Sequence, residues 1–130
     1  MATVEIGKGN FKDTVSKEGI VLIDWWATWC APCRAFAPVF EQASAKHPDI
    51  TFGKIDTDQE VELSGAFAIR SIPTLMVFRD GIMLFERAGA LPAAAIEDIV
   101  RQVRELDMND VRKQLVAREV RQQPSDSSQA

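Results

Sequence analysis

Residues 24–34 have the sequence Asp-Trp-Trp-Ala-Thr-Trp-Cys-Ala-Pro-Cys-Arg and contain the only two cysteines of the chain, Cys30 and Cys33. An apolar run, Ile20 to Ile23, precedes this stretch, and a segment with helical spacing follows it. The pair is therefore predicted to lie where a strand ends and a helix begins. A helix start has unpaired N–H groups and the positive end of the helix dipole, and both favour a thiolate. Since the thiolate attacks disulfides, this position suits thiol–disulfide exchange.

A Cys-x-x-Cys pair at a helix start can alternate between dithiol and disulfide, because one helical turn brings the second sulfur close to the first. Cys30, nearer the exposed helix start, is predicted to be the nucleophile. Cys33, further along and more buried, is predicted to attack the mixed disulfide and release the reduced substrate. Pro32 lacks an N–H and fixes its own φ, so it fits the first helical turn.

Two structural alternatives for the cysteines are a zinc site and a passive disulfide. A zinc site needs about four protein ligands, whereas the chain has two cysteines and one histidine, His47, so no metal is expected. A disulfide across two residues closes too small a loop to constrain the unfolded chain much. The pair is therefore predicted to be redox-active.

The composition predicts one domain, because 130 residues can bury a core without disulfides. The net charge is −4, so no nucleic-acid partner is expected. Residues 1–5 lack a charged n-region, and no apolar run approaches the roughly 18 residues of a membrane span. A monomeric, soluble, cytoplasmic protein without a membrane partner is expected, and in that reducing compartment a close cysteine pair is more often catalytic or metal-binding than structural.

Hydrophobic periodicity predicts alternating strands and helices. The predicted strands are 4–6, 20–27, 50–56, 74–79 and 82–88, and the predicted helices are 10–18, 33–46, 59–68 and 92–106. Asn10 is expected to cap the first helix, and Pro38 to kink the second without ending it. Asp80-Gly81 predicts a hairpin between the last two strands. Helices that alternate with parallel strands, completed by a hairpin and a helix, predict an α/β layered sheet.

The chain beyond Leu106 differs in composition. Residues 107–121 keep helical spacing but are densely charged, which predicts a helix that either extends the preceding one or follows a turn. Residues 122–130 are rich in Gln and Ser without an apolar anchor, which predicts disorder. The expected organisation is a domain over 1–106, a charged helical extension over 107–121 and a tail over 122–130.

The chain resembles the thioredoxin family from about Val4 to Leu106. The resemblance rests on motifs in the family's order and spacing: Trp29 to Arg34, the aspartate that precedes them, Ile72-Pro73-Thr74 and Gly89-Ala90-Leu91. It implies the thioredoxin fold, a central mixed β-sheet of about five strands flanked by about four helices, here with a C-terminal helical extension.

The resemblance also assigns roles around the cysteines. It makes Cys30 the attacking and Cys33 the resolving cysteine, with Asp24 as the buried carboxylate beneath them. A charged residue in an apolar strand is costly unless it is paired or protonated. Burial should raise the pKa of Asp24, which suits a group that accepts the Cys33 proton. Lys54 occupies the place of the lysine that the family pairs with this carboxylate; alternatively Asp24 serves fold specificity and Lys54 only reaches solvent.

A client-binding rim is implied by the same resemblance. Ile72-Pro73 matches the family's cis-proline turn, which offers backbone groups to an extended client; a trans proline at a strand start is the alternative. Gly89 would let a client backbone pass close by. The residues of this modestly apolar rim are Trp29, Ala31, Pro32, Ile72, Pro73, Gly89 and Ala90.

The function implied by the resemblance is that of a general protein-disulfide reductase. Such a protein maintains cell redox homeostasis by electron transport, needs no cofactor beyond its Cys30–Cys33 disulfide, serves disulfide-containing clients and is recharged by an NADPH-dependent thioredoxin reductase. The sequence departs from the family at Ala31, where glycine is usual, and at Trp25, where phenylalanine is common. Two alternatives stay open: an interaction module or holdase that uses the rim and the charged extension, and a dedicated reductase with one client.

Overall fold

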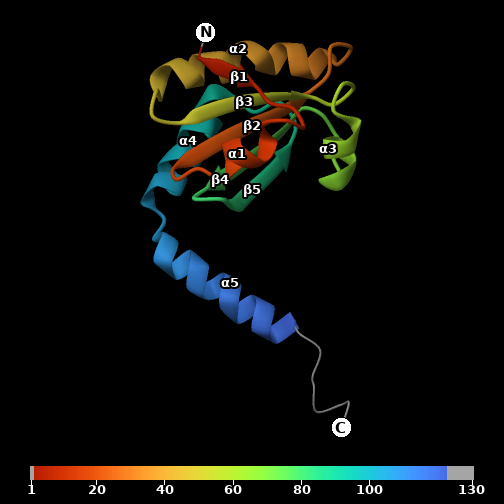
Figure 1. Cartoon of the computed structure of the whole chain (residues 1–130). Coiled ribbons are helices and arrows are strands. Elements are labelled where there is room, and N and C mark those ends of the chain that lie inside the picture. The colour runs from red at the N-terminus through yellow and green to blue at the C-terminus, as the bar shows by residue number, and fades with distance from the viewer. Residues whose placement is uncertain (1, 123–130) are drawn as a thin grey trace.

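The strands form one sheet in the order β1-β3-β2-β4-β5 (Figure 1). This computed structural model describes residues 2–122. The strands are β1 (Thr3–Glu5), β2 (Ile20–Trp26), β3 (Thr51–Asp56), β4 (Thr74–Arg79) and β5 (Ile82–Ala88). β2 is central and its first six residues are buried, as expected for a strand that helices cover on both faces.

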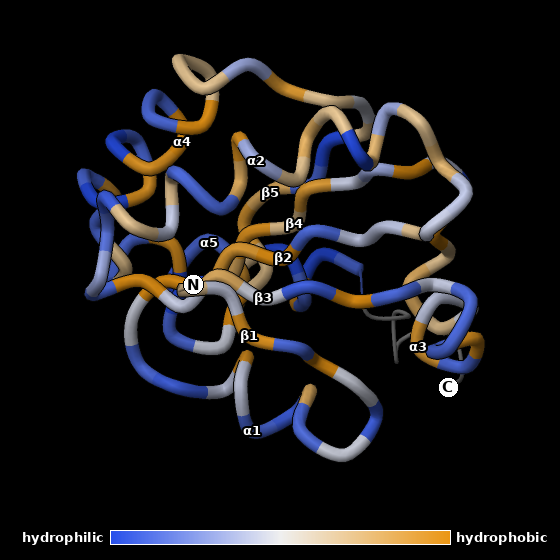
Figure 2. The backbone as a smooth tube through the Cα atoms, turned by 90° about the horizontal axis from the view of Figure 1, so that it is seen from above, coloured by the Kyte–Doolittle hydropathy of each residue, from blue (hydrophilic) through white to orange (hydrophobic). Residues whose placement is uncertain are grey.

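Helices α1 (Phe11–Val15), α2 (Ala31–Lys46), α3 (Val61–Ala66) and α4 (Ala93–Glu105) lie on the faces of the sheet. A further helix, α5 (Met108–Gln122), follows them in the chain. Phe36 and Phe40 of α2 and Ile96 of α4 pack on one face of the sheet. Phe11 of α1 and Leu63 of α3 pack on the other. Figure 2 shows the hydrophobic central strands between these helices.

The direction of β4 is the main departure from the pattern of alternating elements. β1, β3 and β2 are parallel, as the alternation of helices and strands predicts. β4, however, lies antiparallel to β2. The prediction of parallel strands before the hairpin was therefore wrong at β4, whereas the mixed five-stranded sheet that the family resemblance implies is confirmed.

Several predicted boundaries are confirmed and two helices are shorter than predicted. β4 and β5 match their predicted ranges, and Asp80 and Gly81 between them have φ values of 54° and 81°, as a tight hairpin turn requires. α1 ends at Val15, and the side chain of Asn10 accepts from the N–H of Gly7 (2.7 Å) instead of capping the helix. α3 covers only six residues. α2 continues through Pro38, as predicted.

The charged extension is a separate helix. Leu106 has an extended backbone (φ −65°, ψ 138°), which ends α4 before α5 begins at Met108. α5 points away from the sheet (Figure 1) and extends to Gln122, one residue into the predicted tail. The rest of that tail, 123–130, lies outside the described residues.

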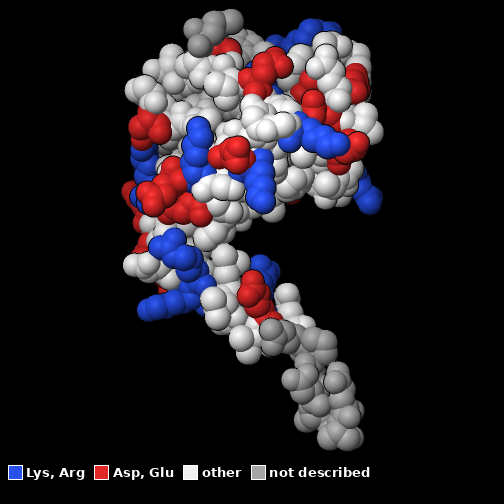
Figure 3. Space-filling view, viewed as in Figure 1, with Lys and Arg blue, Asp and Glu red and all other residues white. Residues whose placement is uncertain are grey.

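The surface carries acidic and basic side chains side by side on the face in Figure 3. They form exposed ion pairs such as Lys8–Glu62 (2.9 Å) and Arg104–Asp49 (2.7 Å). Exposed pairs of this kind contribute little to stability. Within residues 2–122, no helix combines the length and apolar character that a membrane crossing requires.

Candidate redox-active site

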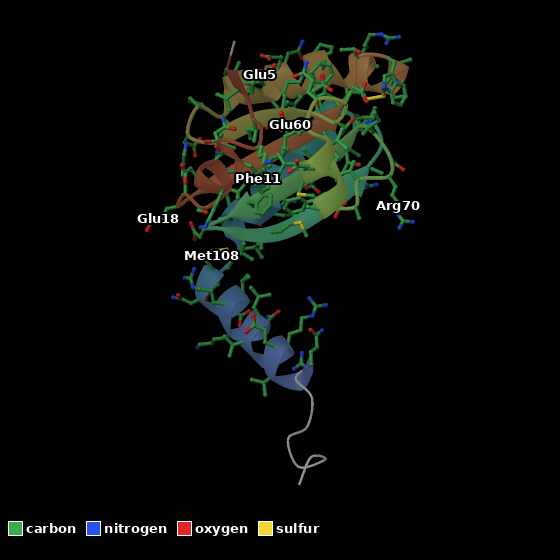
Figure 4. All side chains as sticks on the ribbon, turned by 45° about the vertical axis from the view of Figure 1, so that its right-hand side comes forward. Glu5, Phe11, Glu18, Glu60, Arg70 and Met108 are labelled. Carbon is green, nitrogen blue, oxygen red and sulfur yellow. A yellow bond between two sulfur atoms is a disulfide. The ribbon has the colours of Figure 1, made fainter. Side chains whose placement is uncertain are left out.

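Cys30 and Cys33 lie at the start of α2 and are joined by a disulfide, which Figure 4 draws as a yellow bond. Cys30 is the N-cap residue, and its sulfur accepts a hydrogen bond from the backbone N–H of Cys33 (3.2 Å). Pro32 lies in the first helical turn, where a missing N–H costs little. The predicted place of the pair, between β2 and a helix start, is confirmed.

The exposed fractions of Cys30 and Cys33 differ less than predicted. Cys30 is 4% exposed and Cys33 is 3% exposed in the disulfide form. The difference between the cysteines lies in their place on the helix. Only Cys30 is at the N-cap, where the N–H of Cys33 points at its sulfur and the start of the helix favours a thiolate.

Two further chain segments meet the disulfide. The Sγ atom of Cys30 lies 3.6 Å from the carbonyl oxygen of Ile72. The Ile72–Pro73 peptide bond is cis, as the resemblance implies. The N–H of Gly89 donates to the carbonyl of Pro73 (2.8 Å), which ties the loop after β5 to this turn. The structure thus brings together the three segments that the sequence motifs indicated.

Asp24 is fully buried in β2, and neither of its carboxylate oxygens has a hydrogen-bond partner among the described residues. Burial raises the pKa of Asp24 from 3.8 to about 7, although the positive charge of Lys54 partly opposes this shift. Near neutral pH the carboxyl group can therefore either hold or accept a proton.

Lys54 lies beside Asp24 but forms no ion pair with it. The two residues are partners in the register of β2 and β3. The Nζ atom of Lys54 lies 4.9 Å from the centroid of the Trp26 ring, over its face. Lys54 therefore acts on Asp24 through its charge, and a cation–π contact holds its ammonium group.

The residues predicted for the rim have different exposures. Trp29 is 67% exposed, and the other exposed residues are Ala31, Pro32, Gly89 and Ala90. Ile72 is half-buried and packs against the cysteine pair. Pro73 is buried, and its carbonyl accepts the N–H of Gly89, so its part in client binding stays a prediction that rests on its backbone.

Gly89 has a φ of +105°, a conformation that side chains rarely adopt. No atom lies within 4 Å of where its Cβ would be. The backbone conformation therefore already requires glycine, and the open space beside it can admit a client backbone.

Sequence reasoning missed two side chains that hold the turn before Cys30. Asp58 accepts from Nε1 of Trp29 (3.0 Å), and Arg34 donates to the carbonyl of Thr28 (2.9 Å). The bond of Arg34 reaches a backbone carbonyl six residues earlier, before the helix begins, so the helical spacing does not indicate it. Asp58 is distant in sequence from Trp29, and no local pattern indicates their contact.

A metal site has no support in the part of the chain that the structure describes, since no three His, Cys, Asp or Glu side chains gather there. His47 lies at the far end of α2 and takes part in another network. Its Nε2 is 2.8 Å from Glu97, and its Nδ1 is 3.2 Å from Arg104. His47 thus links α2 to α4.

Comparisons with known proteins agree with this geometry. The family model described as thioredoxin matches residues 2–102. The chain is 52% identical over 112 residues to a putative thioredoxin 2 of Streptomyces coelicolor, which covers 86% of this chain and 84% of that protein. It is 38% identical over 103 residues to a thioredoxin of Bacillus subtilis, which covers 78% of this chain and 98% of the relative.

Solved structures show the same likeness. A mutant thioredoxin from Halobacterium salinarum superimposes with a TM-score of 0.73 at 32% identity, covering 81% of this chain and 92% of the other. Plasmodium falciparum thioredoxin gives 0.70 at 27% identity, covering 77% and 97%. The chain therefore belongs to the thioredoxin family and is a protein-disulfide oxidoreductase with Cys30 and Cys33 as its Cys-x-x-Cys pair.

Proposed function

We propose that this chain is a general protein-disulfide reductase whose reacting atoms are the sulfurs of Cys30 and Cys33. The observation that carries the proposal is the place of Cys30. It is the N-cap of α2, its sulfur accepts an N–H bond, and it faces the Ile72 carbonyl at 3.6 Å. A thiolate is stabilised there, and a client backbone can approach it.

The reaction proceeds in two exchanges. The Cys30 thiolate attacks one sulfur of a client disulfide, a Cys30–client bond forms, and the other client sulfur leaves as a thiolate. The Cys33 sulfur then attacks Sγ of Cys30, which forms the intramolecular disulfide and releases the second client thiolate. Two electrons pass from the cysteine pair to the client, and the client thiolates take up two protons.

Asp24 serves as the proton acceptor for Cys33 in the second exchange. Its support is its burial in β2, the strand that precedes the cysteine pair, and its pKa of about 7, which matches a base that works near neutral pH. Lys54 tunes this group through its charge, which favours the carboxylate form.

The rim of the site binds extended client segments. Trp29, Ala31, Pro32, Gly89 and Ala90 are exposed around the disulfide, and Ile72 offers a backbone carbonyl beside it. Contacts to backbone and to a modest apolar surface select weakly among clients, which suits a general reductase.

The domain organisation, the location and the electron donor that we propose follow from this role. Residues 1–106 form the reductase domain and residues 107–121 an extension to it. The protein works as a monomer in the cytoplasm without a cofactor, receives electrons from an NADPH-dependent thioredoxin reductase and takes part in electron transport that maintains cell redox homeostasis.

An insulin-reduction assay tests the proposal. With dithiothreitol as the electron donor, the protein should accelerate precipitation of the insulin B chain, and no acceleration over dithiothreitol alone would overturn it. A Cys33→Ser variant should retain clients as mixed disulfides on Cys30. Many trapped clients indicate a general reductase, whereas one dominant client would show a dedicated one.

A further inference from the structure

A tight turn connects the end of β2 to Cys30 at the start of α2. The N–H of Cys30 donates to the carbonyl of Ala27 (3.3 Å), which leaves Thr28 and Trp29 at the corner of the turn. Both corner residues are exposed, so the buried core does not hold them. The position of the Cys30 sulfur depends on what fixes this corner.

Arg34, in the first turn of α2, bonds to the corner of this turn. Its Nη1 donates to the carbonyl oxygen of Thr28 (2.9 Å), and its backbone N–H donates to the carbonyl of Cys30 (3.1 Å). On the other side of the turn, Asp58 accepts from the indole of Trp29 (3.0 Å). The exposed turn is thus held from two sides by side chains outside it.

Arg34 has no ion-pair partner within residues 2–122, and the first turn of α2 contains no acidic residue. A guanidinium group makes a charge-assisted bond to a carbonyl, which is stronger than a bond between neutral groups. A cation near a thiol also favours the thiolate.

We propose that Arg34 is a positioning residue for the nucleophile: its bond to the Thr28 carbonyl fixes the turn that presents Cys30, and its unpaired charge favours the Cys30 thiolate. The inference rests on the proposed function, because Cys30 must be the attacking sulfur. It adds a residue that acts through the turn before Cys30 and is not a reacting group.

The test compares Arg34→Met, which removes the bond and the charge, with Arg34→Lys, which keeps the charge and a group that can donate to the Thr28 carbonyl. Lys46→Met is the matched control, because it removes an exposed cation from the opposite end of α2. The measurement is the rate of iodoacetamide alkylation of Cys30 in the reduced protein between about pH 5 and 9, a range that spans the thiol pKa values expected at helix starts, together with insulin reduction near pH 7.

Arg34→Met should alkylate about threefold to tenfold more slowly at about pH 6, with its pH profile shifted to higher pH, since a rise of half a unit to one unit in the thiol pKa lowers the thiolate fraction by that factor. Arg34→Lys should recover most of the rate, and Lys46→Met should equal the unmodified chain. Equal profiles for Arg34→Met and the unmodified chain would overturn the inference.

The two proposals fail in different ways. If the unmodified protein does not reduce insulin, the proposed function fails, while the alkylation profile still measures the effect of Arg34 on Cys30. If insulin is reduced but Arg34→Met alters neither the profile nor the rate, the function stands and the role of Arg34 is wrong. A lower melting temperature with an unchanged profile would likewise show a structural role only.

Discussion

The two ends of the sheet are built differently. At the redox end, three chain segments meet at Cys30, Ile72 and Gly89, and each continues into or from a strand of the sheet. At the opposite end, α5 is attached by the buried Met108, by a bond from Arg79 to the Leu106 carbonyl (3.2 Å) and by a 4.0 Å contact between Arg112 and Asp80. From this difference we expect disulfide exchange to depend on the redox end and not on α5.

The largest expected effect comes from removing the nucleophile at the redox end. Cys30→Ser should lower insulin reduction at least about a thousandfold, because a serine hydroxyl is not ionised near neutral pH and cannot form the mixed disulfide. Far-UV circular dichroism should show an unchanged fold. Substantial remaining activity would mean that Cys33 can attack clients, which would contradict the assignment of Cys30 as the nucleophile and Cys33 as the resolving cysteine.

Asp24→Asn tests the buried carboxyl group and should change stability in a pH-dependent way. The pKa of Asp24 is about 7 in the folded protein and 3.8 in the unfolded reference, so folding favours the protonated form. The resulting stabilisation is complete below about pH 3.8 and is lost as the pH rises through about 7. A difference of about 3 pKa units corresponds to about 4 kcal/mol as an upper limit.

The asparagine variant should therefore be more stable than the unmodified chain above about pH 7 and nearly equal to it near pH 4. Urea unfolding at the two pH values checks this result. Client release from the mixed disulfide should slow by about tenfold near pH 7, a modest loss for the removal of a general base. An equal stability difference at both pH values would show that Asp24 does not titrate between them.

Lys54→Met should have a smaller effect on the same group. Because the charge of Lys54 lowers the pKa of Asp24, its removal should move the pH dependence of client release to higher pH and slow the step near pH 7 by roughly twofold to threefold. Stopped-flow measurements of release across neutral pH would detect the shift. Lys8→Met, a change at an exposed lysine paired with Glu62, is the control.

Removal of residues 110–130 should have the smallest effect, because it leaves Met108 and the whole redox end in place. Insulin reduction should stay within about twofold of the full chain, since none of the removed side chains that the structure describes contacts the site. A large loss of activity would contradict the separation of the two ends and assign the charged extension a part in client binding.

The sequence predicts this fold well where local chemistry decides the structure. β4 and β5 have their predicted bounds because Asp80-Gly81 determines the turn between them. The direction of β4 relative to β2 is decided by packing between distant segments, so the order of elements did not indicate it. α1 ends at Val15, and the side chain of Asn10 bonds to Gly7 before the helix instead of capping it, neither of which the sequence pattern revealed.

In the site, too, features set by local sequence were predicted and features set by tertiary packing were not. The cysteine pair and the buried aspartate stand out in the sequence by type and spacing, and the structure places the aspartate in β2 and the pair just beyond it. The contacts of Trp29 with Asp58 and of Lys54 with the Trp26 ring join residues from different strands and loops. Such contacts depend on tertiary packing and could not be predicted from local patterns.

The midpoint potential of the Cys30–Cys33 couple tests the reductase assignment most directly. It can be measured from the fraction of disulfide in glutathione or dithiothreitol buffers of known potential. A value near about −270 mV, taken from the thioredoxin family, is expected, and any value more negative than about −230 mV supports a reductase. A value near about −120 mV, at the oxidant end of the scale, would contradict it.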